Sequence, residues 1–354
     1  MTHIWMRAEN RANERRTALT PAGARALRER GYRVTAEDSP GRIIPIAAYS
    51  DAGCRIVPAG SWRDAPRDAL ILGLKELPDD GTALVHRHVM FGHAFKGQHA
   101  GRRLLSRFRA GGGTLLDLEY LVDDGGRRVA AFGYWAGFAG AAVTLLTRAA
   151  QTGSGICPPV TLWPDKAALL ADLRAALDSA GTPPPDAIVI GALGRVGRGA
   201  TDLCRAMEVP VTAWDMAETA HGGPFPEILQ HVLFFNCILA RPGTPVFVGP
   251  AALDAPRRLR AIGDIACDPD SDYNPVPLYD RSTTWDAPVI RVAGDPPLDV
   301  MAIDNLPSLL PLESSHDFAA QLLPSLLELD KLGTGLWGRA AAVFAKHVEK
   351  GESA

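Results

Sequence analysis

The sequence predicts an α/β protein with two domains, each built around a parallel sheet. One observation is the length, because 354 residues exceed the size at which a single hydrophobic core usually stops growing. The other is a repeated alternation of short apolar runs with helix-like stretches, since helical crossovers are the usual connection between parallel strands. Hydrophobic content of 47% and charged content of 22% are ordinary for globular proteins.

The first third of the chain begins this alternation. Residues 21–30 are expected to form a helix with Thr20 as its N-cap, and residues 32–36 a short strand. The continuous apolar runs at 69–74 and 113–118 are typical of strands that are buried on both faces. These elements predict the first parallel sheet.

A stretch rich in Ala, Gly and Leu at residues 136–150 predicts a closely packed helix, and we expect the domain boundary near it. Two Gly/Pro-rich connections, 153–164 and 181–185, flank a further helix at 165–180. From residue 187 onward, the pattern of strand, glycine turn, helix and strand predicts a second parallel sheet, with strands at 187–190, 211–214, 232–235, 259–263 and 288–292.

Two amphipathic segments near the end of the chain, residues 317–329 and 336–347, are expected to form helices that pack back on the first domain. The boundaries then follow from the 136–150 helix and from the start of the first amphipathic segment. We predict a discontinuous first domain of residues 1–131 plus 317–354 and a second domain of residues 132–316.

A glycine-rich turn begins the second sheet. Gly191, Gly194 and Gly197 stand between a predicted strand and a predicted helix, where the backbone bends sharply and a helix N-terminus faces a pyrophosphate. The spacing G-x-x-G-x-x-G differs by one residue from the usual G-x-G-x-x-G, and an ordinary glycine-rich turn is the alternative. Asp215 ends the next strand, about 20 residues later, where an acid binds the adenine ribose and repels a 2′-phosphate. Residues 132–316 are therefore predicted to bind NAD rather than NADP.

Segments along nearly the whole chain resemble known dehydrogenases. Residues 15–21 (Arg-Arg-Thr-Ala-Leu-Thr-Pro) and 73–78 (Gly-Leu-Lys-Glu-Leu-Pro) resemble the N-terminal domain of alanine dehydrogenases, transhydrogenases and lysine-forming saccharopine dehydrogenases. The last of these families is also resembled, in order, at residues 56–62, 65–68, 126–140, 191–195, 222–225 and 306–311. The resemblance implies two Rossmann-like domains with parallel sheets, an active site in the interdomain cleft, and NAD-dependent conversion of saccharopine to L-lysine and 2-oxoglutarate.

The resemblance implies that Lys75 and His93 are the acid/base groups and that Glu76 and Glu119 are active-site acids. The alternative for Lys75 is a lysine at a strand end that extends to solvent. Residues 86–93 carry several histidines, whose alternatives are polar loop residues or a metal site, and the missing cysteines and H-E-x-x-H spacing disfavour a metal. A carboxylate raises the pKa of a neighbouring lysine whereas desolvation lowers it, so the sequence leaves the sign for Lys75 open.

Guanidinium groups suit a substrate with three carboxylates because they bind carboxylates in a bidentate fork. The alternatives are a solvated turn for Arg127 and Arg128 and a surface charge for Arg16. The resemblance implies that the substrate-binding residues are Arg16, Lys75, Gln98, Arg128, Phe132, Ala266, Cys267 and Asp268. It implies that the cofactor-binding residues are Arg127, Gly194, Arg195, Asp215, Thr219, Leu239, Ile265, Ile303, Asp304, Asn305 and Leu306, with Leu239 in place of an aromatic residue.

Bulk properties exclude several other classes of protein. The net charge of −3 indicates neither a nucleic-acid nor a membrane partner, and no run approaches the ~20 apolar residues of a membrane span. Five scattered cysteines predict neither a disulfide framework nor a zinc site. We expect a cytoplasmic monomer or small homo-oligomer that binds small molecules and no metal. The competing hypotheses are an alanine dehydrogenase-like or other opine dehydrogenase and a non-catalytic NAD-binding regulatory protein.

Overall fold

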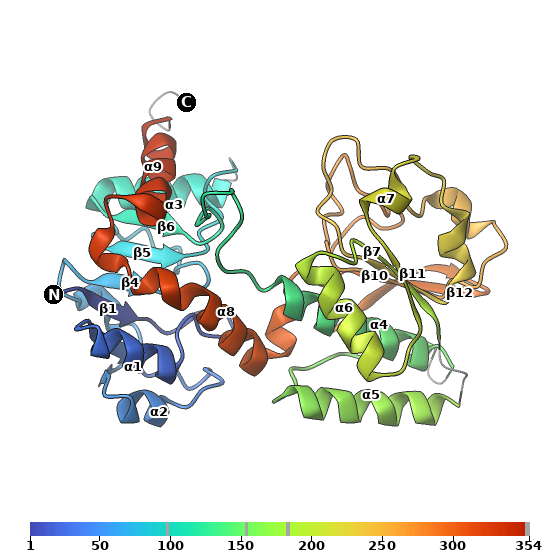
Figure 1. Ribbon diagram of the computed structural model, residues 1–354, viewed down its shortest axis with the longest axis horizontal. Helices are drawn as coiled ribbons and strands as arrows, with labels where there is room; N and C mark the ends of the chain where they lie inside the picture. The colour runs from blue at the N-terminus through green and yellow to red at the C-terminus, as the bar shows by residue number, and fades with distance from the viewer. Residues whose placement is uncertain (97–98, 153–154, 182–184, 351–354) are drawn as a thin grey trace. The chain divides into compact units, whose positions relative to one another are not determined.

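The computed structural model describes residues 1–96, 99–152, 155–181 and 185–350. The chain forms two compact units (Figure 1). Unit 1 comprises Met1–Ala131 and Pro311–Ala354, and unit 2 comprises Phe132–Leu310. No helix of the described residues is long and apolar enough to span a membrane.

Unit 1 contains a six-stranded sheet in the order β3-β2-β1-β4-β5-β6, and every neighbouring pair is parallel. This is the doubly wound order of Rossmann-like folds, in which the chain leaves β1 toward β3 and then crosses back to β4. The topological switch point therefore lies at the carboxyl ends of β1 and β4. The strands are β1 (His3–Met6), β2 (Arg33–Glu37), β3 (Arg55–Val57), β4 (Leu70–Leu72), β5 (Arg87–Met90) and β6 (Thr114–Asp117).

The helices of unit 1 are α1 (Pro21–Glu29), α2 (Ile46–Asp51), α3 (His99–Gly111), α8 (Pro311–Leu326) and α9 (Gly335–Lys350), with 3-10 turns η1 (Ser61–Asp64) and η5 (Leu329–Lys331). Thr20 caps α1, as predicted, because its side chain accepts a hydrogen bond from the N–H of Gly23. Helix α8 begins at Pro311, earlier than the expected residue 317, since proline suits the first position of a helix. Its Ser315 hydroxyl accepts from the N–H of Thr17, 3.0 Å away, so α8 packs on unit 1.

Unit 2 contains a second six-stranded sheet, in the order β11-β12-β10-β9-β7-β8. Its parallel strands are β7 (Ala187–Ile190), β8 (Val211–Trp214), β9 (Leu233–Asn236), β10 (Ala261–Asp264) and β12 (Pro297–Met301). The chain goes from β7 to β8 on one side and then to β9 on the other. The switch point is therefore at the carboxyl ends of β7 and β9.

The expectation that the strand at 288–292 belongs to an all-parallel sheet was wrong. This strand is β11 (Val289–Gly294), which pairs antiparallel with β12. The sequence pattern missed β12 because Pro297 and Asp299 interrupt its apolar run. Asp299 is fully buried and forms two hydrogen bonds of 2.7 and 2.9 Å with Arg291 of β11, which makes an acid tolerable inside the strand.

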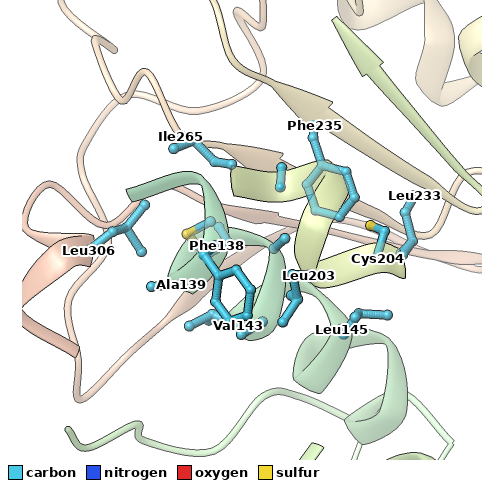
Figure 2. Packing of buried hydrophobic residues seen from close by; sticks show 14 of the residues in the cluster. Phe138, Ala139, Val143, Leu145, Leu203, Cys204, Leu233, Phe235, Ile265 and Leu306 are labelled. Atoms are coloured by element: carbon cyan, nitrogen blue, oxygen red, sulfur yellow. The ribbon is translucent and has the colours of Figure 1, made fainter. Parts of the chain in front are cut away.

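The core of unit 2 is built around α4 (Gly133–Ala150). Figure 2 shows Phe138 and Val143 of this helix close to Leu203 of α6 (Arg195–Ala206) and Phe235 of β9, all fully buried. Because α4 and α6 cover the sheet beside β7, this packing fixes the turn between β7 and α6. The remaining elements are α5 (Lys166–Ala180), α7 (Met216–Thr219), η2 (Pro226–Gln230), η3 (Pro250–Leu253) and η4 (Leu306–Leu309).

Candidate active site

The predicted catalytic residues of unit 1 follow the carboxyl ends of neighbouring parallel strands. Lys75 comes shortly after β4, His93 after β5 and Glu119 after β6, while Arg16 lies in the long segment after β1. The carboxyl ends of parallel strands share one edge of a sheet, and ligands of doubly wound folds bind at this edge. Gln98, also predicted to bind substrate, lies outside the described residues.

Arg16 is buried against Glu14, an acid that no sequence pattern singled out. Nε of Arg16 donates to Oε1 of Glu14 at 2.8 Å and Nη2 donates to Oε2 at 2.6 Å. Burial raises the pKa of Glu14, but the charge and hydrogen bonds of Arg16 outweigh it and hold this pKa below its usual value. The interpretation of Arg16 as a surface charge is therefore wrong. A guanidinium has five N–H donors, and Glu14 accepts from two of those on the Arg16 side chain.

Lys75 is partly buried beside this pair, and the structure gives its pKa the sign that the sequence left open. Burial lowers the pKa of the Lys75 ammonium, and the charges of Arg16 and Arg11 also lower it. Glu14 and Glu76 raise it, yet the net shift is downward. Glu76 is exposed and lies 3.9 Å from Arg11, so it is a weak partner for Lys75. The lowered pKa increases the fraction of neutral amine, the form that accepts a proton.

His93 lies beside Glu119 in the loop after β5. Its Nδ1 is 3.7 Å from Oε2 of Glu119, whose Oε1 lies 3.0 Å from Nζ of Lys96. The interaction with His93, followed by that with Lys96, lowers the pKa of Glu119 to about 2 even though burial opposes it. The backbone of His93 has φ 48°, an uncommon value for a residue other than glycine that is frequent at functional sites.

Asp117, the last residue of β6, holds the loops that carry His93 and Glu119. Its carboxylate accepts hydrogen bonds from the N–H of Gly92 at 3.2 Å and of Glu119 at 2.9 Å. Burial raises the pKa of Asp117 to about 6. One buried carboxyl therefore connects the two loops, a connection that local sequence patterns do not reveal.

The neighbouring histidines are core residues. His86 and His88 are buried, and His88 on β5 packs edge-on against Trp62 and Phe108. The alternative that the histidines of residues 86–93 are polar loop residues is therefore wrong for these two. Among the described residues, no group of three or more His, Cys, Asp or Glu side chains could hold a metal ion.

Arg127 and Arg128 lie on the turn after β6. Arg127 is exposed and pairs with Asp123, its Nε 3.3 Å from Oδ2, as the solvated-turn alternative expects. Val122 and Arg128 form an isolated antiparallel bridge that closes this turn. The charge of Arg128 also contributes to the lowered pKa of Glu119.

In unit 2, the glycine turn lies at the switch point between β7 and β9. Gly191 has φ +87°, and a Cβ there would lie 2.8 Å from Ile238. A Cβ on Gly197 would lie 2.1 Å from the carbonyl oxygen of Gly191, so the turn requires glycine at both positions. Gly194 is the N-cap of α6 and Arg195 its first residue, which places the N–H groups of the first turn of the helix at the turn.

Asp215 directly follows β8 and faces the glycine turn. Its Oδ2 accepts from the N–H of Leu193 at 3.0 Å and its Oδ1 from the N–H of Met216 at 2.9 Å. The Thr219 hydroxyl donates to the carbonyl of Asp215 at 3.1 Å. Asp215 therefore joins the turn after β7 to the loop after β8 and stays only half-buried.

Three exposed apolar side chains follow the carboxyl ends of β7, β8 and β9. Leu193 in the glycine turn, Met216 after β8 and Leu239 after β9 are 79%, 82% and 68% exposed. Large exposed apolar side chains that gather at the binding edge of a doubly wound sheet suit the flat faces of a nucleotide base. Leu239 is among the residues that the resemblance implies, whereas Leu193 and Met216 are not, because their exposure is a property of the fold.

The other predicted residues of unit 2 lie at the same edge. Ile265 to Asp268 follow β10, residues 303–306 follow β12, and Phe132 is the N-cap of α4. Ile265, Ile303 and Leu306 are buried in the core, while Asp268 and Asp304 are exposed and Ala266, Cys267 and Asn305 are partly buried. Asp264 orients the first segment, because it accepts from the N–H of Cys267 at 3.3 Å and from the Tyr279 hydroxyl at 2.7 Å.

Known proteins resemble this chain over nearly its whole length. The alanine dehydrogenase/PNT N-terminal domain model matches residues 5–139. The NAD(+), L-lysine-forming saccharopine dehydrogenase of Schizosaccharomyces pombe is 43% identical and aligns with 98% of this chain and 99% of its own. Its counterparts in Yarrowia lipolytica and Neurospora crassa are each 45% identical over 98% of this chain and 97% and 96% of their own.

Solved structures share the fold. An L-alanine dehydrogenase superposes with a TM-score of 0.66 at 17% identity over 98% of this chain and 94% of its own. A transhydrogenase from Sinorhizobium meliloti gives a TM-score of 0.64 at 17% identity over 94% and 95%. The relatives that exceed 40% identity decide the family, and the chain belongs to the NAD(+)-dependent, L-lysine-forming saccharopine dehydrogenases.

Proposed function

We propose that this chain catalyses the reversible NAD-dependent oxidative deamination of saccharopine to L-lysine and 2-oxoglutarate. The observation that carries the proposal is 43–45% identity to L-lysine-forming saccharopine dehydrogenases over 98% of the chain. The paired charges after β1, β4, β5 and β6 of unit 1 support it, since the reaction needs acid/base groups and cations for carboxylates.

Unit 2 is the NAD-binding unit in this proposal. The glycine turn leaves room for the pyrophosphate, Asp215 binds the ribose, and the exposed Leu193, Met216 and Leu239 contact the adenine. NAD held by these residues would supply the acceptor for the hydride that leaves the substrate carbon. We assign the remaining contacts to Arg127 of unit 1 and to Gly194, Arg195, Thr219, Ile265, Ile303, Asp304, Asn305 and Leu306 of unit 2.

Lys75 and His93 move the protons. Lys75, with its lowered pKa, takes the proton of the secondary amine as that amine is oxidised. His93, oriented by ionised Glu119, directs water onto the imine carbon, and cleavage of the carbon–nitrogen bond then releases lysine and 2-oxoglutarate. Arg16 and Arg128 bind substrate carboxylates, and Gln98, Phe132 and the Ala266–Asp268 segment complete the binding site.

The test is substrate specificity in the direction that consumes NADH. The purified chain should oxidise NADH with L-lysine plus 2-oxoglutarate, and mass spectrometry should identify saccharopine as the product. NADPH should be a poor substitute, because Asp215 repels a 2′-phosphate. Turnover only with pyruvate plus ammonia would indicate an alanine dehydrogenase instead. NADH binding without turnover of any pair would indicate a regulatory protein.

We also propose that the enzyme is a cytoplasmic monomer or small homo-oligomer whose partners are small molecules. The near-neutral charge of −3 supports this, since it favours neither nucleic acid nor anionic membranes. Analytical ultracentrifugation of the purified chain measures the oligomeric state, and cell fractionation measures the location. A large assembly or a membrane-bound fraction would contradict the proposal.

A further inference from the structure

Arg7 and Glu9 form a buried ion pair at the switch point of unit 1. They follow β1 directly, and Nη1 of Arg7 lies 3.3 Å from Oε2 of Glu9. The side chains are 0% and 8% exposed. Removing two charges from water is costly, and a buried ion pair often stabilises a fold no better than apolar residues do. Its place at the switch point therefore calls for an explanation other than stability.

The hydrogen bonds of this pair converge on the backbone of Lys75. Oε2 of Glu9 accepts from the N–H of Lys75 at 2.9 Å, and Oε1 accepts from the N–H of Leu74 at 2.7 Å. On the other side, Nη2 of Arg7 donates to the carbonyl oxygen of Lys75. One ion pair thus holds both backbone polar groups of Lys75.

The sheet does not hold Lys75 in this way, because β4 ends at Leu72. The backbone bonds that continue from β4 are those from Gly73 N–H to Val89 and from Phe91 N–H to Leu74, each within 3.0 Å. They stop one residue before Lys75. Beyond the end of the strand, the hydrogen bonds of Arg7 and Glu9 therefore hold the backbone of Lys75 in place of the sheet.

Gly73 makes room for this arrangement. A Cβ at this position would lie 2.4 Å from Nε and 2.6 Å from Cζ of Arg7, so only glycine lets the guanidinium pass over the end of β4. The backbone of Gly73 does not have a positive φ, so alanine there is not excluded by conformation. Gly73→Ala would therefore disturb Arg7 without altering any charge.

We propose that Arg7 and Glu9 are positioning residues for catalysis, which hold Lys75 at the reacting amine through its backbone N–H and C=O. The proposal rests on the proposed role of Lys75 as the base. It differs from the effect of Glu14 and Arg16, which act on Lys75 through charge. A base that is displaced by about 1 Å loses on the order of 100-fold in rate, although the substrate still binds.

A double-mutant cycle tests the proposal in the full-length enzyme. Glu9→Gln and Gly73→Ala should each lower kcat about 100-fold while the Kd of NADH and the KM of lysine change less than about 3-fold. In a Lys75→Met background, neither change should lower kcat further, because a displaced lysine and a missing lysine are equivalent. A merely structural role would lower the rate by the same factor in both backgrounds.

Two variants serve as matched controls. Asp186→Asn alters a carboxylate of unit 2 that also pairs with an arginine, Arg258 at 3.1 Å, and accepts from a backbone N–H, that of Val232 at 3.3 Å. Gly41→Ala adds a methyl group where nothing lies within 4 Å. Both should retain the wild-type kcat.

Each contrary result has one meaning. Unchanged kcat in both Glu9→Gln and Gly73→Ala, or equal losses with and without Lys75, would overturn the positioning role. Full turnover by Lys75→Met would overturn it as well, by removing Lys75 from the mechanism. Failure of the proposed function is distinct, because the wild-type enzyme itself would then not condense lysine with 2-oxoglutarate. If Glu9→Gln fails to fold, Gly73→Ala alone decides the question.

Discussion

The second strand of each unit leads to a carboxylate, and the two units use it in opposite ways. Glu37 ends β2 and is fully buried, with its oxygens accepting from the indole N–H of Trp5 at 3.0 Å and from the backbone N–H groups of Ala8, Gly60 and Trp62 at 2.9, 2.8 and 2.6 Å. Asp215 follows β8, is half-buried, and accepts from three backbone N–H groups, those of Leu193, Met216 and, in the capping box of α7, Glu218.

This difference supports the proposal that unit 2, and not unit 1, binds the nucleotide. In a dinucleotide-binding fold, the acid after the second strand binds ribose hydroxyls. A carboxylate has about four lone-pair sites, and the four donors to Glu37 leave none for a ribose. Where unit 2 has a glycine turn after its first strand, unit 1 has the buried side chain of Arg7. Topology alone does not give the function, which depends on the side chains at the edge.

The largest expected effect is the loss of turnover in Lys75→Met. It tests whether the proposed chemistry in unit 1 is separable from the proposed nucleotide binding in unit 2. Lys75→Met should lower kcat about 100-fold to 10,000-fold, because it removes the proposed general base. The Kd of NADH, measured by protein fluorescence, should stay within about 2-fold, since all the proposed nucleotide contacts except Arg127 are in unit 2. Loss of NADH binding together with turnover would break the division of roles.

Replacement of Asp215, the acid of unit 2, is expected to have the next largest effect. Asp215→Ala should weaken NADH binding about 10-fold to 100-fold, because hydrogen bonds to a charged group contribute about 1.5–3 kcal/mol. NADPH should lose less affinity than NADH, or gain some, since the negative charge that repels its phosphate is gone. Calorimetric titration with both nucleotides measures the two affinities. Equal losses for both would argue that Asp215 holds the turn rather than the ribose.

Local patterns predicted several elements of both units, among them those that we propose bind the nucleotide. The Thr20 cap, the glycine turn and Asp215 after β8 are signals within a few residues, where side-chain chemistry and backbone geometry are directly coupled. The same holds for α4, whose small residues indicate close packing. Such features need no knowledge of distant parts of the chain.

The rest depends on contacts between distant residues. The lowered pKa of Lys75 depends on burial and on Arg16, and the burial of His88 depends on Trp62 and Phe108. The buried acid of strand β12, Asp299, is explained by its distant partners Arg291, across the hairpin, and Gln151. Periodicity within one segment carries no information about a partner from another segment.

Glu37 of unit 1, which corresponds in position to Asp215, is expected to affect stability rather than nucleotide binding. Glu37→Gln should leave the NADH affinity within about 2-fold but lower the free energy of unfolding by about 1–3 kcal/mol, because an amide nitrogen then faces buried N–H donors. Chemical denaturation of the full chain, followed by tryptophan fluorescence, measures the loss. Weaker nucleotide binding without loss of stability would contradict the view that Glu37 serves only the fold of unit 1.

The smallest expected effect is a change in the free energy of unfolding that appears only at acidic pH. It depends on buried titratable groups, which differ between the two units. Burial lowers the pKa of His88 well below 6.5, whereas burial raises that of Asp264 in unit 2. Neither ring nitrogen of His88 has a hydrogen-bond partner among the described residues. The unfolded chain therefore takes up a proton below pH 6.5 that folded unit 1 resists, and stability falls as the pH drops.

His88→Phe should abolish this loss while keeping the edge-on ring contacts with Trp62 and Phe108. At pH 5 the variant should gain about 2 kcal/mol relative to the wild type beyond any difference at pH 8, since each pH unit below the unfolded pKa costs about 1.4 kcal/mol. Hydrogen exchange of the full chain at the two pH values, resolved by peptide, should locate the gain in unit 1. A gain that is equal at both pH values would mean that packing, and not the proton, limits the stability of this strand.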